Sequence, residues 1–163
     1  MDYRIIEKPG FAVAARIRRF TTVNEENFVK IPEWWEEFLA SEECGRLTAL
    51  TANKPGPVTG GGMLGICKGE GVELFYGIGV ELPRGTTSGQ FESIEIPSAT
   101  WAVFDCTVPS IQETTKRIFS EWFPATSYEH DEVPELEVYL QPAGTVMPCQ
   151  IWIPVKKKSQ QPS

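Results

Sequence analysis

The sequence predicts an α+β fold built from two βαββ units, and three observations carry this prediction. The order strand, helix, strand, strand occurs twice along the 163 residues. Each expected helix carries four bulky apolar side chains at matching positions, in the blocks Trp34–Leu39 and Ile118–Phe123. A chain of this length suits one domain or two tightly fused half-domains. Any helix that covers a sheet needs such a stripe of apolar side chains, so the stripe alone does not indicate duplication. The repeated order of strands and helices is what indicates it.

The strands of the first half are expected at Tyr3–Ile6, Phe11–Phe20, Met63–Cys67 and Val72–Leu82. Their β-branched and aromatic side chains are typical of sheets, and Pro9-Gly10 favours a turn between the first two. The last two are separated by a short Gly-containing segment, which predicts a hairpin.

The helix of the first half is expected near Pro32–Ala40, where apolar side chains recur at helical spacing. Asn24 is expected to cap its start, and the Cys44-Gly45 pair is expected to end it. Pro32 either opens a second helical segment or kinks one longer helix, and both alternatives stay open.

The second half repeats the order with Thr100–Cys106 as a strand, Ile111–Phe123 as a helix, and Leu136–Leu140 and Gln150–Val155 as strands. Between the halves lies a loop rich in Thr, Ser and Gly. We therefore expect one domain over 1–156, with halves at about 1–83 and 92–156 and a polar tail at 157–163.

Charge and apolar patterning exclude several classes of function. The formal net charge of −7 opposes nucleic-acid binding, which depends on Lys and Arg, and favours cationic ligands. No apolar stretch reaches the roughly 20 residues of a membrane helix, and the start lacks a signal-peptide core. A cytoplasmic location, without membrane contact, is expected.

Cysteine and histidine content predicts neither a metal site nor a cofactor. Cys44, Cys67, Cys106 and Cys149 are scattered and His130 is the only histidine, so no zinc-binding spacing exists. Two disulfides are formally possible, but the cysteines are interpreted as small buried residues. His130 is expected in a polar loop, in contact with solvent or in a local hydrogen bond.

The glycine run at 60–62 is interpreted as a flexible turn. A phosphate-binding loop would need a following Gly-Lys-Ser/Thr and a helix, and neither is expected here.

Strand alternation selects the candidate site. Glu137 and Tyr139 project to one face of their strand with Glu135, while the intervening leucine and valine side chains project to the other. A carboxylate beside an aromatic ring suits an organic cation. The alternative is that Glu137 lies on a solvated sheet face.

Three further aromatic residues are candidates for the same ligand site. Trp152 is expected on the side of Glu137 if their strands pair, and Trp101 is a weaker candidate because the facing of its strand is unsettled. In the first half, Tyr76 is preferred to its neighbour Phe75, since a hydroxyl group tolerates a wet cleft.

Several segments resemble the GyrI-like effector-binding family, which includes the drug-binding domains of the regulators BmrR and Rob. The resemblance is carried by Ile96–Phe104, Ile118–Pro124, Pro134–Tyr139 and Ile151–Val155, with Tyr3–Ile6 and Phe11–Ala14 fitting the family's opening. It implies two βαββ units about a pseudo-twofold axis, with antiparallel sheets, helices on one face and a ligand cleft between the halves.

The resemblance also implies a function and a role for Glu137. The sequence leaves no room for a DNA-binding segment before the module, so a free-standing member without direct nucleic-acid binding is expected. Its partner would be a small hydrophobic or cationic molecule, and Glu137 matches the acidic residue at the base of the family's pocket. Two alternatives remain: a hydrolase of cyclopropane-bearing genotoxins using Glu137 beside Tyr139, and a gyrase-inhibitor-like module with a protein partner.

Overall fold

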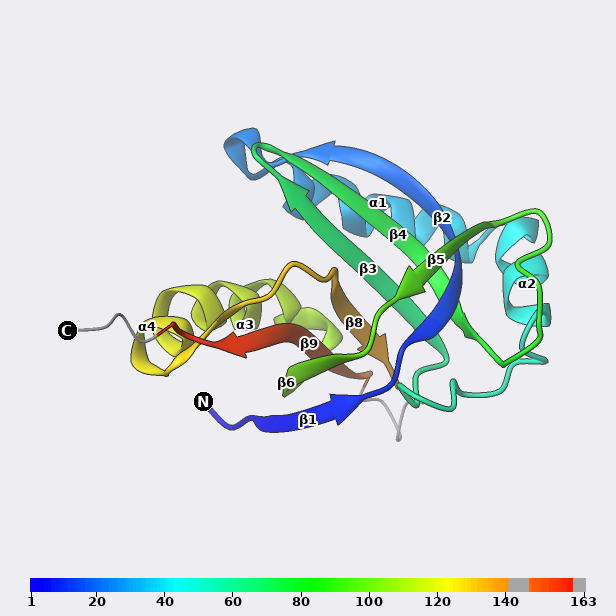
Figure 1. The fold of residues 1–163 in the computed structure, drawn as a ribbon. Helices are drawn as coiled ribbons and strands as arrows, with labels where there is room; N and C mark the ends of the chain where they lie inside the picture. Colours follow the sequence, from blue (N-terminus) through cyan, green and yellow to red (C-terminus); the bar gives the residue numbers. More distant parts are fainter. Residues whose placement is uncertain (141–146, 160–163) are drawn as a thin grey trace.

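The computed structural model describes residues 1–140 and 147–159, which form a nine-stranded antiparallel sheet with helices packed on it (Figure 1). The strands are β1 (Arg4–Lys8), β2 (Phe11–Thr21), β3 (Met63–Glu70), β4 (Glu73–Leu82), β5 (Glu92–Ile96), β6 (Ala99–Thr107), β7 (Tyr128–His130), β8 (Glu135–Tyr139) and β9 (Pro148–Lys157). The helical segments are η1 (Val23–Glu25), α1 (Asn27–Leu39), α2 (Glu42–Ala49), η2 (Val108–Ser110), α3 (Ile111–Arg117), η3 (Ile118–Trp122) and α4 (Phe123–Ala125).

The two halves repeat one arrangement, which confirms the predicted α+β fold. In the first half β2 pairs with β4 and β4 with β3, and in the second half β6 pairs with β9 and β9 with β8. The halves are joined where β3 pairs with β8. Each half also begins with a short strand that pairs with the other half, β1 with β6 and β5 with β2.

The short leading strands close the sheet on itself. β1 continues into β2 across Pro9-Gly10, β5 continues into β6 across Pro97-Ser98, and one register runs through both pairings. The two bends face each other closely, because a Cβ on Gly10 would lie 2.9 Å from the carbonyl oxygen of Ile96. Pro97 and Gly10 therefore let both chains turn at the same point.

The closed sheet encloses an apolar interior, and its outer face carries the helices. The buried interior residues are Phe11, Val13, Ala15, Leu64, Ile66, Ile96, Trp101, Val103, Leu136, Val138 and Trp152. α1 and α2 cover the first half through Trp34, Phe38 and Leu47, and η3 covers the second through Ile118 and Trp122 (Figure 1). Among the described residues, no helix has the length and apolar character needed to cross a bilayer.

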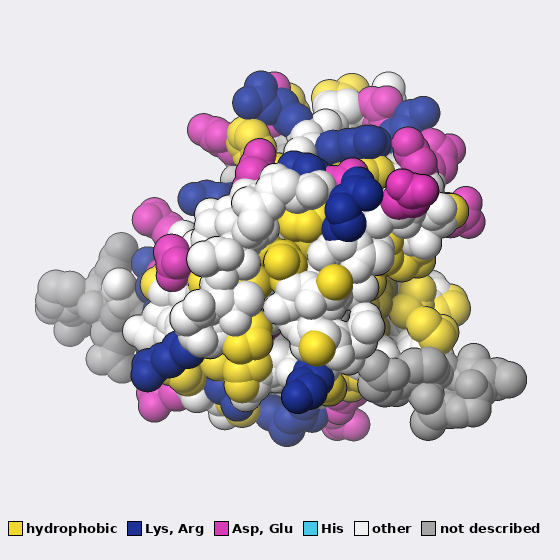
Figure 2. All heavy atoms as spheres, turned by 90° about the vertical axis from the view of Figure 1, so that its right-hand side faces the viewer, with side chains coloured by type: hydrophobic (Ala, Val, Ile, Leu, Met, Phe, Trp, Pro, Cys, Tyr) yellow, Lys and Arg dark blue, Asp and Glu magenta, His cyan; other side chains and the backbone are white. Residues whose placement is uncertain are grey.

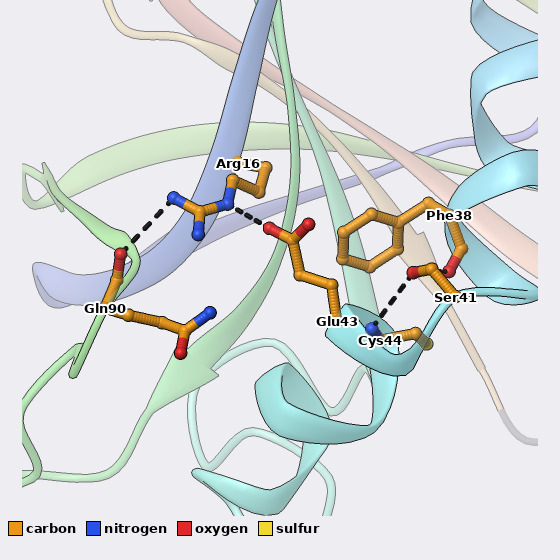
Figure 3. Close-up of polar contacts among 6 residues, drawn as sticks. All are labelled: Arg16, Phe38, Ser41, Glu43, Cys44 and Gln90. Atoms are coloured by element: carbon orange, nitrogen blue, oxygen red, sulfur yellow. Dashed lines mark hydrogen bonds and ion pairs between the residues drawn. The ribbon is translucent and has the colours of Figure 1, made fainter.

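Local features of the first helical region differ from the prediction. Asn24 does not cap α1 but lies in η1 with φ of 55°. Pro32 lies within the single helix α1. The Cys44-Gly45 pair does not end a helix, because it lies inside α2, whose N-terminus is capped by the Ser41 hydroxyl accepting from the Cys44 amide at 3.4 Å (Figure 3).

Two short strands were not predicted from the sequence. β5 falls in the expected loop between the halves, and β7 falls in the expected polar loop around His130. The local hydrogen bond expected of His130 is present, because its Nε2 lies 2.8 Å from Glu135 Oε1. At the other end, β9 extends to Lys157 and the Lys158 ammonium group bonds the Thr126 carbonyl oxygen at 2.8 Å. Residues 160–163 of the expected tail lie outside the described residues.

Arg16 of β2 links α2 to the segment just before β5. Its guanidinium group bonds the Glu43 carboxylate of α2 and the Gln90 carbonyl oxygen, the latter at 3.3 Å (Figure 3), and lies 4.8 Å from the ring centre of Phe91. The right-hand side of Figure 1 is shown face-on in Figure 2, where basic and acidic side chains intermix at the top of this face. Neighbouring charges of both signs therefore offset one another on this surface.

The Gly/Pro-rich passage after α2 is tied to the sheet by a buried carboxylate. Glu81 in β4 is 2% exposed and accepts hydrogen bonds from the amides of Val58 and Thr59 and from the Thr59 hydroxyl, each at 2.8 Å. Gly56 passes so close that a Cβ there would overlap the Glu81 carboxyl group. The predicted flexible turn is thus fastened to β4 close to its glycine run.

Replacing Glu81 with Gln should lower stability, because the amide keeps one acceptor oxygen and turns an NH2 group toward backbone donors. Leaving such donors unsatisfied costs about 1–3 kcal/mol, so the urea midpoint should fall with little change in slope. Glu73→Gln on the exposed end of the same strand is the matched control. Equal midpoints for E81Q and the parent would contradict this role.

Candidate ligand-binding site

The seam between β3 and β8 positions the candidate site. In this pairing Gly65 lies opposite Glu137 and Met63 lies opposite Tyr139, while the alternating leucine, isoleucine and valine residues point to the interior. Tyr76 of β4 lies opposite Cys67 and packs with α1, so this face of the seam is the helical face. The site therefore lies on the outside of the closed sheet, where the two halves meet.

Glu137 is held by two phenol groups. The hydroxyls of Tyr76 and Tyr139 both donate to Oε1 of Glu137, the second at 2.8 Å. The indole Nε1 of Trp35, from α1, donates in turn to the Tyr76 hydroxyl at 2.8 Å. No donor from the described residues reaches Oε2. One carboxylate oxygen is thus fixed, and the other is free to meet a ligand.

Gly65 provides the space for this cluster. A Cβ at this position would overlap the Tyr76 hydroxyl and the Glu137 carboxylate. Only glycine lets a tyrosine from β4 reach across β3 to a glutamate on β8. We name Glu137, Tyr76, Tyr139, Trp35 and Gly65 the central site.

Aromatic rings surround the carboxylate. The rings of Trp35 and Tyr139 lie 4.9 Å apart between centroids at 61°, an edge-to-face arrangement. Trp34 makes a similar contact with Tyr76 at 6.3 Å. Trp35 and Tyr139 are half-buried whereas Tyr76 is 2% exposed, so an incoming ligand would meet the first two rings.

Burial controls the protonation of the cluster. Loss of hydration raises the pKa of Glu137, the hydrogen bonds from Tyr76 and Tyr139 oppose that rise, and the charge of Glu135 adds to it. Burial and the nearby Glu137 charge raise the pKa of both tyrosines, so they remain protonated donors. The carboxyl group of Glu137 is therefore incompletely compensated by its protein neighbours.

A second carboxylate lies on the same strand face and has its own partner. Glu135 is bonded by His130, and that hydrogen bond, opposed by partial burial, raises the pKa of the imidazole. Protonation of His130 would offset the charge of Glu135. Glu137 has no such cationic partner among the described residues.

The structure brings together three of the five predicted site residues and separates two. Glu137, Tyr139 and Tyr76 form one hydrogen-bonded cluster. Trp152 lies opposite Leu136, not on the side of Glu137, so the predicted facing was wrong. Trp152 and Trp101 pack against each other in the interior, with ring centroids 5.7 Å apart, at 3% and 0% exposed.

Trp35 was missed by the sequence reasoning. Its signal was present, because the adjacent residues Trp34 and Trp35 point about 100° apart on a helix and cannot share one direction. Trp34 enters the core beneath α1, and Trp35 turns toward the β3–β8 seam.

Two surface hollows lie outside the central site. One, of about 370 Å³, lies between α1 and the end of β2 and is lined in part by Arg18, Phe20 and Lys30. The other, of about 540 Å³, is lined in part by Glu7 and Lys156. Neither hollow is lined by Glu137.

Comparison with known proteins supports a shared fold. A family model described as Cass2, integron-associated effector binding protein, matches residues 4–155. The structure of SAV2435 bound to tetraphenylphosphonium has a TM-score of 0.75 at 17% identity, over 96% of this chain and 94% of that one. No curated protein matches the sequence.

Two further solved structures agree with this assignment. A putative bacterial transcription regulation protein from Staphylococcus aureus MU50 has a TM-score of 0.73 at 16% identity, over 96% of this chain and 99% of that one. The integron cassette protein VCH_CASS2 from the mobile metagenome of Vibrio cholerae has a TM-score of 0.60 at 16% identity, over 94% and 95%. The resemblance to effector-binding proteins is confirmed.

The raised pKa of Glu137 predicts a pH-dependent stability. The folded state binds the Glu137 proton more tightly than the unfolded chain does. The stability that this proton adds is therefore fully present below the ordinary carboxyl pKa of 4.5, and it is lost as pH rises through the raised pKa of the folded state. The unfolding free energy of the parent, relative to Glu137→Gln, should therefore fall as pH rises from about 4.5 and then level off. A flat difference, or a carboxyl titration midpoint below 4.5 in carbon-13 NMR, would contradict the assignment.

Proposed function

The chain belongs to the Cass2 family of integron-associated effector binding proteins, and on that premise we propose that it binds small aromatic cations at the central site. The single observation that carries the proposal is the Glu137 carboxylate, with one oxygen held by two tyrosines and the other without a donor from residues 1–140 or 147–159.

The physical basis is the incomplete compensation of a half-buried negative charge. A carboxylate that has lost hydration is strongly stabilised by a cation placed nearby. The raised pKa of Glu137 indicates that its protein neighbours do not fully compensate its charge. A delocalised organic cation costs less to dehydrate than a small metal ion. Its flat or bulky substituents can also contact the rings of Trp35 and Tyr139.

Ligand entry is proposed to involve a movement of Trp35. Trp35 packs on Tyr139 and is held by a hydrogen bond to Tyr76. We infer that its indole swings away from the seam when the ligand enters and then contacts the ligand, since rotamer changes are common on binding. The aromatic cation bound by the related SAV2435 structure is of the chemical class proposed.

A raised carboxyl pKa also suits proton transfer, which supports hydrolysis of a strained-ring electrophile as the second candidate function. In that case Glu137 would accept a proton from the attacking water, and the phenol of Tyr139 would orient the carboxylate. Binding and turnover use the same side chains, so product formation separates them.

Titration calorimetry with tetraphenylphosphonium and with neutral triphenylphosphine oxide tests the proposal. Glu137→Gln preserves shape but removes charge, so affinity for the cation should fall at least about 10-fold while affinity for the neutral compound changes much less. Trp35→Ala should weaken both, because packing area is lost regardless of charge.

The matched control is Glu73→Gln, which should bind both compounds as the parent does. Equal losses of cation and neutral affinity in E137Q would overturn the role of Glu137 as a charge partner. Mass spectrometry of a cyclopropane-bearing electrophile incubated with the protein would favour the hydrolase if product forms with the parent and not with E137Q.

A further inference from the structure

We propose that Cys106 and Cys149 are an oxidative modification site, in which a small-molecule disulfide converts the two thiols to a cross-strand disulfide that weakens ligand binding at the central site. The second half of this inference rests on the proposed function, whereas disulfide formation does not.

The register of β6 and β9 brings the two cysteines together. Cys106 lies directly opposite Cys149 in this antiparallel pair. Directly opposite residues have Cα atoms about 4.5–5.5 Å apart, within the 4.4–6.8 Å that disulfides span. The two side chains point to the same face because the residues are directly paired, and the Cys149 thiol donates to the Gln150 carbonyl oxygen at 3.7 Å. Both cysteines are free thiols in the structure.

The two thiols have different environments, which assigns them different roles. Cys106 is half-buried and can be reached by a reagent, whereas Cys149 is 1% exposed. Contact with the neighbouring Cys149 thiol lowers the pKa of Cys106 despite its partial burial. The same contact raises the pKa of Cys149. Cys106 is therefore the attacking thiolate and Cys149 the resolving thiol.

The reaction is thiol–disulfide exchange and needs only a small-molecule disulfide as oxidant. The Cys106 thiolate attacks one sulfur of the reagent, forms a mixed disulfide and releases one thiolate. Cys149 then loses its proton and attacks the Cys106 sulfur, which releases the second thiolate. The protein loses two protons and two electrons, and the reagent disulfide gains them to become two thiols.

Cys106 and Cys149 are connected to the central site through the pairing of β9 with β8. Cys149 lies opposite Tyr139 on β8, and the Tyr139 hydroxyl donates to Glu137. A disulfide bond is about 2.05 Å long, far shorter than a thiol–thiol contact, so its formation draws Cys149 toward β6 and away from β8. We therefore expect the donor geometry of Tyr139 to loosen and the site to bind cations less well.

The other two cysteines serve as internal controls. Cys67 on β3 lies opposite Tyr76 and Glu135, and Cys44 lies on α2, so neither faces another cysteine across a strand pair. Burial also raises the pKa of both thiols. Neither should react readily with a mild disulfide reagent.

Incubating the full chain with oxidised glutathione, blocking remaining thiols and measuring intact mass and peptide maps tests the first half. The parent, Cys44→Ser and Cys67→Ser should each lose about 2 Da and yield the linked Cys106 and Cys149 peptides. Cys149→Ser should stop at a glutathione adduct on Cys106, and Cys106→Ser should give neither product. A parent that forms no cross-link, or that is modified first at Cys44 or Cys67, would overturn the proposal.

Calorimetry with tetraphenylphosphonium tests the second half. Oxidised parent should bind it about fivefold or more weakly than reduced parent, with recovery on reduction, while Cys149→Ser should show no oxidation-dependent loss of this kind. Equal affinities of the two parent states would overturn the coupling. A reduced parent that does not bind the cation at all would refute the proposed function, and the mass readout of the disulfide would still stand by itself.

Discussion

The pairing of β3 with β8 is the constraint on which the rest of the structure depends. It joins the two halves, and it alternates so that Leu64 and Val138 enter the interior while Gly65 and Glu137 face the helices. The absence of a side chain at Gly65 is what allows Tyr76 to cross β3 and reach Glu137. The same seam thus stabilises the fold on one face and assembles the candidate site on the other.

Glu81 and Glu137 both accept several hydrogen bonds, but the donors are distributed differently over their carboxylate oxygens. Glu81 accepts hydrogen bonds on both oxygens, from Val58 on Oε2 and from Thr59 on Oε1, and its role is to fasten a loop. Both phenol donors to Glu137 instead converge on Oε1. A carboxylate built only for structure has its charge spread over several donors, as Glu81 does. One that retains an open oxygen and a raised pKa is suited to an external partner.

Local patterns predicted the repeated fold and the Glu137 and Tyr139 pair, because alternation within one strand is set by the backbone alone. The facing of Trp152 relative to Glu137 depends instead on the register between β8 and β9, which places Trp152 opposite Leu136. No residue near Trp152 encodes that register. β5 escaped prediction for a related reason, since Glu92–Ile96 has only five residues and is a strand through its pairing with β2. The second helix was not predicted, because Cys44-Gly45 indicates a helix end at a position that lies inside α2. Ser41, which precedes α2, is a good N-cap.

The aromatic residues divide between two physical tasks. Trp101 and Trp152 lie within the closed sheet, where dense packing from both halves fixes the relation of β3 to β8. Trp35 lies on the outer face, half-buried, and its indole N–H bonds only the Tyr76 hydroxyl. A ligand that displaces Trp35 therefore needs a side-chain rotation and no rearrangement of the sheet, which keeps the ordering cost of binding small. The rigid interior holds Glu137 and its two phenols in place, and under the proposed function a rotation of Trp35 would let this one fixed charge accept cations of different shapes.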